Sequence, residues 1–332
     1  MTEQNRPHEI PRKTLGKTEI EVTTVGIGTA FIGMRTTRNG TTARHLDEEL
    51  ALRTVWAALE EGVRLIDTAA LYLDSEAERI VGRALRERPD LAEGVVLETK
   101  CCRLPHGSDY SYDAALRSVE GSLDRLGVKR VELMYIHDPV KEAFDQVMGK
   151  GGALEALRRL QAEGVVGHIG MASNRPYDNA PFIETGEFEM AVVPHAYSLL
   201  NRVALERIFP AAERFGMGVV IATPFGGGGG LLATGVRAAR WDELVNRFTP
   251  ESVAQTERIE SLCDRYGVSL LAAALQYVTR HPVVATTIPG SRSPDESIAN
   301  ARAAREPIPE AFWDELTQLI MSAGTFAVER RP

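Results

Sequence analysis

Short apolar runs alternate along the chain with longer segments of helical spacing. Eight runs, rich in β-branched residues and bounded by glycine, proline or an acidic residue, predict strands at 24–28, 64–67, 95–100, 133–137, 167–171, 190–194, 218–222 and 283–288. Apolar positions with a period of about 3.6 predict helices at 48–60, 76–88, 111–127, 151–162, 177–185, 204–215, 252–266 and 294–303. A helix therefore follows nearly every strand, as in a parallel α/β sheet.

Eight such units favour a closed (β/α)8 TIM barrel, and an open doubly wound sheet is the alternative. No change of composition and no Pro/Gly/Ser-rich linker divides the chain, so residues 1–332 are predicted to form a single domain. Three additions are expected. Segments 13–15 and 20–22 flank a Gly-Lys-Thr turn and predict a hairpin that closes the bottom of the barrel. A long connection covers 225–249, and a C-terminal helix covers 309–322.

Composition narrows the class of protein. The chain has 332 residues, of which 44% are hydrophobic and 25% charged, the proportions of a protein that buries a core. Its net charge of −8 disfavours binding to nucleic acid or an anionic membrane. The polar start and the absence of an apolar run of ~18 residues favour a cytoplasmic location. The three cysteines fit neither a disulfide framework nor a zinc site, so we expect buried thiols and no metal.

Four polar residues lie at or just after successive predicted strands: Asp67, Tyr72, Lys100 and His137. In a parallel barrel the carboxyl ends of all strands surround one opening, so these side chains are expected to converge. There Tyr72 can exchange a proton with a substrate oxygen, Lys100 can lower the pKa of that phenol, Asp67 can hold the lysine, and His137 can donate a hydrogen bond to the same oxygen. Taken singly, Asp67 also fits a helix cap and His137 a structural histidine. The four together predict alcohol–carbonyl chemistry without a metal.

The chain resembles the aldo-keto reductases over nearly its whole length. The motifs that carry the resemblance, in their order and spacing, are LIDTAALY (65–72), VVLETK (95–100), LMYIHDP (133–139), GHIGMASN (167–174), YSLLNR (197–202) and TIPGSRSPDESIAN (287–300). The resemblance implies a TIM barrel and hydride transfer between a nicotinamide and a sugar or small carbonyl compound. It also implies that Asp67, Tyr72, Lys100 and His137 form the catalytic tetrad.

The same resemblance implies a set of cofactor contacts. Ser173 and Asn174 are expected at the nicotinamide carboxamide. Ser291, Arg292 and Asn300 are expected around the adenosine part. The five glycines at 226–230 leave backbone N–H groups open to a pyrophosphate. The full set of predicted cofactor-binding residues is Gly28, Asp67, Ser173, Asn174, His195, Thr223, Phe225, Gly226, Gly227, Ile288, Gly290, Ser291, Arg292, Glu296 and Asn300.

Departures from the family pattern bear on the cofactor and the substrate. At the position of Glu296, many relatives carry a basic residue that would attract the 2′-phosphate of NADP. A carboxylate there favours NAD, while the nearby Arg292 leaves NADP as an alternative cofactor. Ala222 stands at the usual aromatic stacking position. With Pro139, these features resemble the branch of aldose 1-dehydrogenases, galactose dehydrogenases and pyridoxal dehydrogenases. That branch implies oxidation of a cyclic hemiacetal to a lactone, with Tyr72 as the base.

Two other functions stay open from the sequence. The same tetrad would serve an NADPH-dependent carbonyl reductase of a secondary metabolite. A cofactor-sensing interaction subunit is a further alternative, because potassium-channel β subunits also resemble this family. The expected partner is a small-molecule carbonyl compound or sugar, and the sequence is compatible with a monomer or a small homo-oligomer.

Overall fold

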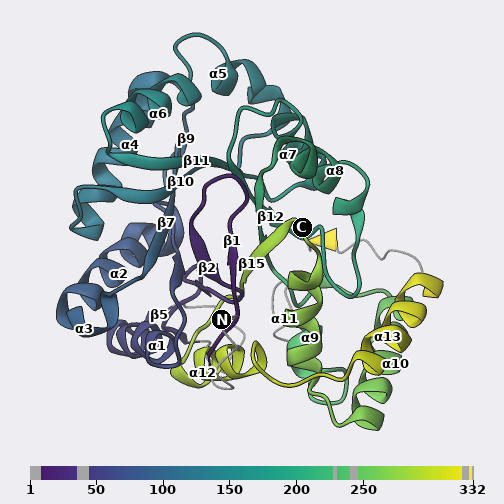
Figure 1. Ribbon diagram of the computed structural model, residues 1–332. Helices are drawn as coiled ribbons and strands as arrows, with labels where there is room; N and C mark the ends of the chain where they lie inside the picture. The colour runs from purple at the N-terminus through teal and green to yellow at the C-terminus, as the bar shows by residue number, and fades with distance from the viewer. Residues whose placement is uncertain (1–8, 36–44, 227–229, 240–245, 324–328, 331–332) are drawn as a thin grey trace, which may run out of the picture.

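Eight parallel strands close into a barrel in the computed structural model, which describes residues 9–35, 45–226, 230–239, 246–323 and 329–330 (Figure 1). The barrel strands are β3 (Ile27–Gly28), β6 (Leu65–Asp67), β7 (Val96–Cys101), β10 (Val131–His137), β11 (Val166–Ala172), β12 (Met190–Pro194), β13 (Gly218–Ala222) and β15 (Val284–Ile288). Each pairs in parallel with the next in this order. All eight fall on predicted strands.

Backbone hydrogen bonds join the first and last strands and so close the sheet. Val25 bridges Thr287 and Gly28 bridges Gly290, both in parallel. The Gly28 N–H donates to the carbonyl of Pro289 over 2.9 Å. A Cβ atom on Gly28 would lie 2.9 Å from the Ile288 carbonyl oxygen, so the seam requires a residue without a side chain. The predicted (β/α)8 barrel is confirmed.

Helices surround the barrel, and the bounds of all but one follow the predicted ones closely. The outer ring contains α1 (Glu48–Glu60), α2 (Glu76–Glu87), α4 (Tyr112–Leu126), α6 (Ala153–Ala162), α7 (Pro176–Ile183), α8 (Ile208–Phe215), α11 (Leu270–Arg280) and α12 (Pro294–Ala303). The predicted helix at 204–215 is divided into a 3-10 turn, η3 (Val203–Leu205), and α8. In the described part of the chain, no helix is long and apolar enough to cross a membrane.

One helix of the barrel ring was missing from the prediction. The segment predicted at 252–266 forms α10 (Pro250–Tyr266), which packs beside α13 (Glu310–Ala323) away from the barrel (Figure 1). The helix that returns the chain to the last strand is α11, which contacts β15 and α12. Leu199, Phe312 and Trp313 belong to the apolar cluster that joins this outer pair of helices to the barrel.

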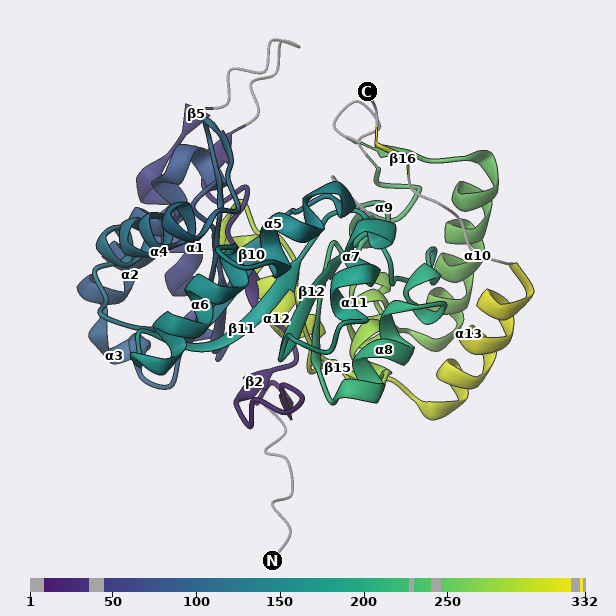
Figure 2. The ribbon, with the colours of Figure 1, turned by 90° about the horizontal axis from the view of Figure 1, so that it is seen from above.

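The predicted hairpin closes the amino-terminal end of the barrel. It consists of β1 (Arg12–Thr14) and β2 (Glu21–Thr23), which pair antiparallel. Leu15 and Val22 are fully buried and join the apolar cluster of the barrel interior. Figure 2 shows the hairpin at one end of the barrel, while β5 (His45–Leu46) lies at the other. The three cysteines are buried free thiols, as predicted.

Shorter elements extend the loops between these strands and helices. They are β4 (Met34–Arg35), α3 (Pro89–Ala92), β8 (Arg103–Leu104), β9 (Gly107–Ser108), η2 (Lys141–Ala143), α5 (Phe144–Met148), α9 (Leu231–Thr234), β14 (Asn246–Arg247) and β16 (Glu329–Arg330). Of these, β8 matters for the site because it directly follows β7. It brings an arginine to the carboxyl end of the barrel.

Candidate active site

The four residues predicted from the strand ends meet at the carboxyl end of the barrel. Asp67 ends β6, Lys100 lies one residue before the end of β7, and His137 ends β10. Tyr72 begins η1 (Tyr72–Ser75), the 3-10 turn that follows β6. The side chains of Asp67, Lys100 and His137 are buried, and Tyr72 is partly buried. Parallel strands thus bring together residues that lie up to 70 positions apart in the sequence.

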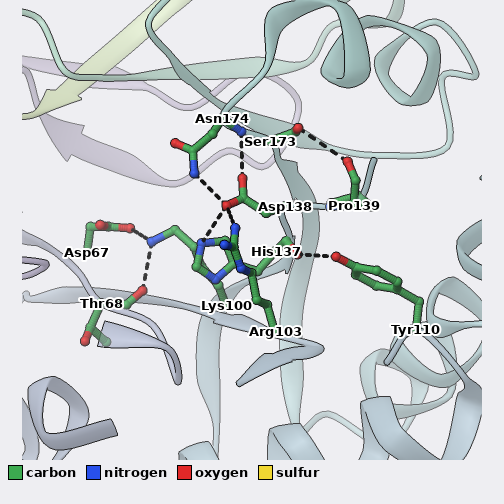
Figure 3. Close-up of polar contacts among 10 residues, drawn as sticks. All are labelled: Asp67, Thr68, Lys100, Arg103, Tyr110, His137, Asp138, Pro139, Ser173 and Asn174. Carbon is green, nitrogen blue, oxygen red and sulfur yellow. Dashed lines mark hydrogen bonds and ion pairs between the residues drawn. The ribbon is translucent and has the colours of Figure 1, made fainter. Parts of the chain in front are cut away.

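Lys100 is the centre of this group. Its Nζ donates to Oδ1 of Asp67 in a buried ion pair and to the carbonyl of Thr68 over 2.8 Å (Figure 3). The same Nζ lies 4.7 Å from the centroid of the Tyr72 ring. The rings of Tyr72 and His137 meet edge to face with centroids 5.8 Å apart. The lysine ammonium is therefore held by one carboxylate and directed at the tyrosine.

The pKa of Tyr72 is set by two opposing effects. Burial raises it to about 12, and the Lys100 charge lowers it, as the sequence predicted for this lysine. Burial also raises the pKa of Asp67, against the opposing effect of Lys100. Burial lowers the pKa of Lys100, but Asp67 and its other acidic neighbours outweigh burial and raise it overall. Lys100 is therefore a cation and Tyr72 a neutral phenol at neutral pH.

His137 is a neutral imidazole. Burial, followed by the charges of Lys100 and Arg103, lowers the pKa of His137 well below its ordinary value. Its backbone carbonyl accepts a hydrogen bond of 2.9 Å from the Tyr110 hydroxyl, which fixes the end of β10. A neutral imidazole keeps one N–H, so His137 can donate a hydrogen bond to a substrate oxygen without transferring a charge to it.

The chain turns in the same way after four of the barrel strands. The first residue beyond β7, β10, β12 and β13 has a left-handed backbone, with φ of 71° at Cys102, 49° at Asp138, 56° at His195 and 57° at Thr223. This conformation costs a residue with a side chain roughly 1–2 kcal/mol. Non-glycine residues held in it are concentrated at functional sites, where the surrounding structure compensates for the strain. These turns all lie at the end of the barrel that carries the tetrad.

Asp138 organises a polar network that the sequence did not predict (Figure 3). Its Oδ1 accepts from the Asn174 backbone N–H over 2.6 Å and its Oδ2 accepts from Asn174 Nδ2 over 2.5 Å. Arg103 from β8 forms an ion pair with the same carboxylate. His137 Nε2 lies 3.9 Å from Oδ2. The only signal in the sequence was the adjacent His-Asp pair at the end of an apolar strand.

The predicted nicotinamide contacts lie beside this network. Ser173 is buried and its hydroxyl donates to the carbonyl of Pro139 over 3.4 Å. Asn174 uses both its backbone N–H and its side-chain amide on Asp138. Across the opening, the Thr223 Oγ1 accepts from the His195 N–H over 2.8 Å and joins the loops after β12 and β13. These residues therefore sit around the same opening as the tetrad.

The residues predicted for the adenosine part lie in α12 and in the loop just before it. Asn300 Nδ2 donates to Ser291 Oγ over 3.2 Å, and both side chains are buried. Arg292 and Glu296 bind each other: the Arg292 backbone N–H donates to Glu296 Oε2 over 2.7 Å, and the guanidinium lies 3.2 Å from Oε1. Arg292, which could bind the 2′-phosphate of NADP, is thus already paired with Glu296, whose charge disfavours that phosphate.

The remaining predicted residues occupy the barrel seam and the loop after β13. Ile288 is buried at the end of β15, and Gly290 is exposed, with the Phe31 ring 3.7 Å from where its Cβ would be. Phe225 is partly buried against the core, and Gly226 has a left-handed φ of 84°. Gly227 lies outside the described residues. Gly28, predicted to let a ligand approach the backbone, lies at the barrel seam, where a Cβ atom would lie 2.9 Å from the Ile288 carbonyl oxygen.

Comparison with known protein families identifies the chain. The model of the aldo/keto reductase family matches residues 25–321. The chain belongs to this family. Aldo/keto reductases are oxidoreductases with nicotinamide cofactors, and this aldo/keto reductase is accordingly an NAD(P)-dependent oxidoreductase of small molecules. The predicted family is confirmed.

Individual relatives indicate which branch of the aldo/keto reductase family the chain resembles. Pyridoxal 4-dehydrogenase of Microbacterium luteolum is 30% identical and covers 92% of this chain and 96% of its own. D-threo-aldose 1-dehydrogenase of a Pseudomonas species is 28% identical and covers 92% of this chain and 98% of its own. Among solved structures, the holo form of an aldo-keto reductase from Bacillus halodurans has the same fold, with a TM-score of 0.76, 24% identity and coverage of 96% and 98%.

Proposed function

We propose that this aldo/keto reductase oxidises the cyclic hemiacetal of an aldose or a related small aldehyde to a lactone, with NAD as the hydride acceptor. The observation that carries the proposal is the buried Asp67–Lys100 pair directed at Tyr72 beside a neutral His137. The names of two relatives, pyridoxal 4-dehydrogenase and D-threo-aldose 1-dehydrogenase, support the proposed class of substrate. An aldose and pyridoxal each have a hydroxyl group that can add to their own aldehyde and close a cyclic hemiacetal.

Proton transfer in this reaction falls to Tyr72. A hemiacetal becomes a lactone when a hydride leaves C1 and a proton leaves the anomeric hydroxyl. Bound nicotinamide supplies the hydride acceptor. The Tyr72 oxygen, as phenolate, takes the proton, and the Lys100 ammonium at 4.7 Å from its ring favours that phenolate. Asp67 holds Lys100 in place, so the cation does not have to reorganise as charge moves.

His137 orients the substrate oxygen. A neutral imidazole N–H donates to the oxygen that changes from hydroxyl to carbonyl, and it binds both forms without forming an ion pair with either. Burial, together with the charges of Lys100 and Arg103, lowers the pKa of His137 and keeps it in this state. The oxygen thus meets a hydrogen-bond donor and a proton acceptor at the same time.

The residues around the opening fit a nicotinamide carboxamide. Asp138 accepts hydrogen bonds from the backbone N–H and from the side-chain Nδ2 of Asn174, which fixes the orientation of the amide. Oδ1 of Asn174 is then the side-chain atom left to accept a hydrogen bond from a carboxamide –NH2 group. The Ser173 hydroxyl, whose bond to Pro139 is long at 3.4 Å, can serve the carboxamide oxygen. Asp138 is therefore a positioning residue for the cofactor site.

NAD is favoured over NADP by the pair at the start of α12. Glu296 holds the Arg292 guanidinium and adds a negative charge where a 2′-phosphate would need a positive one. Carboxylate oxygens can instead accept hydrogen bonds from ribose hydroxyls. The two side chains are about equally exposed, at 37% and 39%, so the pair is accessible from solvent.

Titration of the purified protein with NAD(H) and NADP(H) tests the cofactor assignment. A screen of aldoses and pyridoxal with the preferred cofactor, with product analysis for lactones, tests the reaction. Tighter NAD(H) binding together with lactone formation supports the proposal. Tighter NADP(H) binding with reduction of aldehydes alone contradicts it.

One observation favours the reverse direction as a second candidate. Burial raises the pKa of Tyr72 to about 12, so at neutral pH its hydroxyl is protonated and suited to donate a proton to a carbonyl oxygen. That is the step a carbonyl reductase requires. The pH dependence of the two directions separates the candidates.

A further inference from the structure

A second carboxyl group lies beneath the tetrad. Glu98 is two residues before Lys100 on β7, so both side chains project from the same face of the strand into the barrel. Between them Thr99 points outward and donates to Glu78 of α2 over 2.5 Å. Glu98 is fully buried, and its register partner on β6 is Asp67. The proposed mechanism assigns no role to this side chain.

The buried charges around Glu98 do not balance if every group is ionised. The titratable groups that face it, within the described part of the chain, are Asp67 from β6, Tyr135 from β10 and Lys100 from its own strand. The barrel interior around Tyr135 is otherwise lined by apolar side chains. Two carboxylates and one ammonium would leave a net negative charge in this low-dielectric space, which is strongly unfavourable. One of the two carboxyl groups must therefore carry a proton.

The hydrogen bonds place that proton on Glu98. Asp67 receives the Lys100 ammonium directly, which stabilises its anion. Glu98 receives only the neutral Tyr135 hydroxyl, at 3.0 Å from Oε2. Its Oε1 accepts from no N–H or O–H group in the residues described. The strand register places the Glu98 and Asp67 side chains beside each other, and a hydrogen bond between two such carboxyl groups requires a proton on one of them.

We propose that Glu98 is a neutral carboxylic acid that donates its proton in a hydrogen bond to Asp67 and so positions the Asp67–Lys100 pair for Tyr72. Glu98 touches neither substrate nor cofactor in this arrangement; it is a positioning residue, and its function rests on the proposed role of Tyr72. Burial and the adjacent Asp67 charge raise the pKa of Glu98 well above its ordinary value, consistent with this state.

Infrared spectroscopy tests the protonation state without requiring turnover. The C=O stretch of a protonated carboxyl group lies apart from carboxylate bands. At neutral pH we expect this band in the wild-type protein, a shift of the band when glutamate is labelled with ¹³C, and its loss in Glu98→Gln. Absence of a ¹³C-sensitive band in the wild-type protein overturns the proposal, even if the variant fails to fold.

Glu78→Gln is the matched control for this measurement. Glu78 is also fully buried beside β7, but on its outer face, where Oε2 lies 2.6 Å from the Arg125 guanidinium. That variant should keep the protonated band of Glu98 and lose a carboxylate band instead. Loss of the protonated band in Glu78→Gln would assign the proton to the wrong glutamate and overturn the proposal.

The pH profile of oxidation tests the positioning role. Glutamine is neutral and retains an N–H donor for Asp67, so Glu98→Gln should keep the alkaline part of the profile within about 0.3 pH unit of wild type. An ionised Glu98 would oppose the Tyr72 phenolate, and its removal would move the profile to lower pH by about one unit or more. Glu98→Leu removes the donor, and we expect a loss of turnover that Glu98→Gln does not show. Equal turnover in both variants contradicts positioning.

The two measurements keep this inference separate from the proposed function. Absence of activity on every aldose and aldehyde, with the protonated band present, removes the proposed substrate class and leaves the protonated Glu98. Activity with Tyr72-dependent turnover and no such band removes the Glu98 proposal alone.

Discussion

The raised pKa of Tyr72 leads to a strong pH dependence in one direction of the reaction only. Oxidation needs the phenolate as base. With a pKa of about 12, about one molecule in 100,000 is ionised at pH 7 and about one in 1,000 at pH 9. We therefore expect kcat/KM for oxidation to rise about tenfold per pH unit, or about 100-fold between pH 7 and pH 9. Reduction needs the phenol, which is fully protonated throughout, so its profile should be flat.

The assay follows cofactor absorbance in both directions between pH 6 and pH 9, with the same substrate pair. The positive charge of an oxidised nicotinamide near Tyr72 would lower the pKa of Tyr72, and kcat/KM for oxidation would then level off at a lower pH. Below that pH the profile would keep the same slope. A flat oxidation profile over this range at wild-type rates would refute the assignment of Tyr72 as the base.

Tyr72→Phe completes the test. Phenylalanine keeps the ring that contacts Lys100 at 4.7 Å and His137 at 5.8 Å, so fold and cofactor affinity should be retained. Loss of the proton-transferring hydroxyl should reduce kcat about 10²- to 10⁴-fold, or about 3 to 5 kcal/mol in activation free energy, and should abolish the slope. A kcat within about tenfold of wild type contradicts this role.

Tyr110→Phe is the matched control. Burial raises the pKa of Tyr110 to about 12 as well, but its hydroxyl binds the backbone carbonyl of His137. This variant should lose about 1 kcal/mol of stability and keep the pH slope. A slope that disappears in Tyr110→Phe would mean that the titrating phenol is not Tyr72.

Three further outcomes follow from the site. Asp138→Ala frees Asn174 and should weaken nicotinamide binding about tenfold or more, because hydrogen bonds to a charged group contribute ~1.5–3 kcal/mol each; an unchanged Kd in fluorescence titration contradicts its positioning role. Glu296→Gln releases Arg292 and removes a negative charge. The affinity for NADP relative to NAD should rise about fivefold per unit of phosphate charge, and less at high salt. An unchanged ratio of the Kd values for NADP and NAD refutes the role of the pair. His137 has a lowered pKa when folded, so its contribution to stability is complete above the ordinary histidine pKa and is lost as pH falls below it. Wild type should thus lose about 1.4 kcal/mol per pH unit below about pH 6.5 relative to His137→Asn in urea unfolding, and parallel curves contradict a neutral buried imidazole.

The barrel and the tetrad could be predicted from the sequence because both depend on local pattern. Eight short β-branched runs alternate with helical segments, and a parallel sheet with that order has few ways to close. Once the sheet is parallel, residues at strand ends share one opening, so Asp67, Lys100 and His137 could be grouped without coordinates. The hairpin likewise follows from a turn between two short polar–apolar runs.

The helix between β13 and β15 was misassigned because periodicity does not reveal which helix packs on the barrel. Segment 252–266 has a clear amphipathic pattern, and it forms α10 beside α13 at the periphery. Segment 270–280, LLAAALQYVTR, is amphipathic as well and follows α10 after only three residues, and it forms α11, which contacts β15.

Tertiary structure alone decided the charges at the site. The sequence predicts a lysine whose charge lowers the phenol pKa, but the burial that raises this pKa exists only where β7 and β10 bring Lys100 and His137 against the Tyr72 ring. Asp138 acquires its role through a left-handed turn that directs it at Asn174, and Glu98 acquires its role through its register with Asp67 across two strands. Residue types and their spacing are local properties of a chain, whereas protonation depends on burial and on charges brought near from distant segments, which exist only after the barrel has closed.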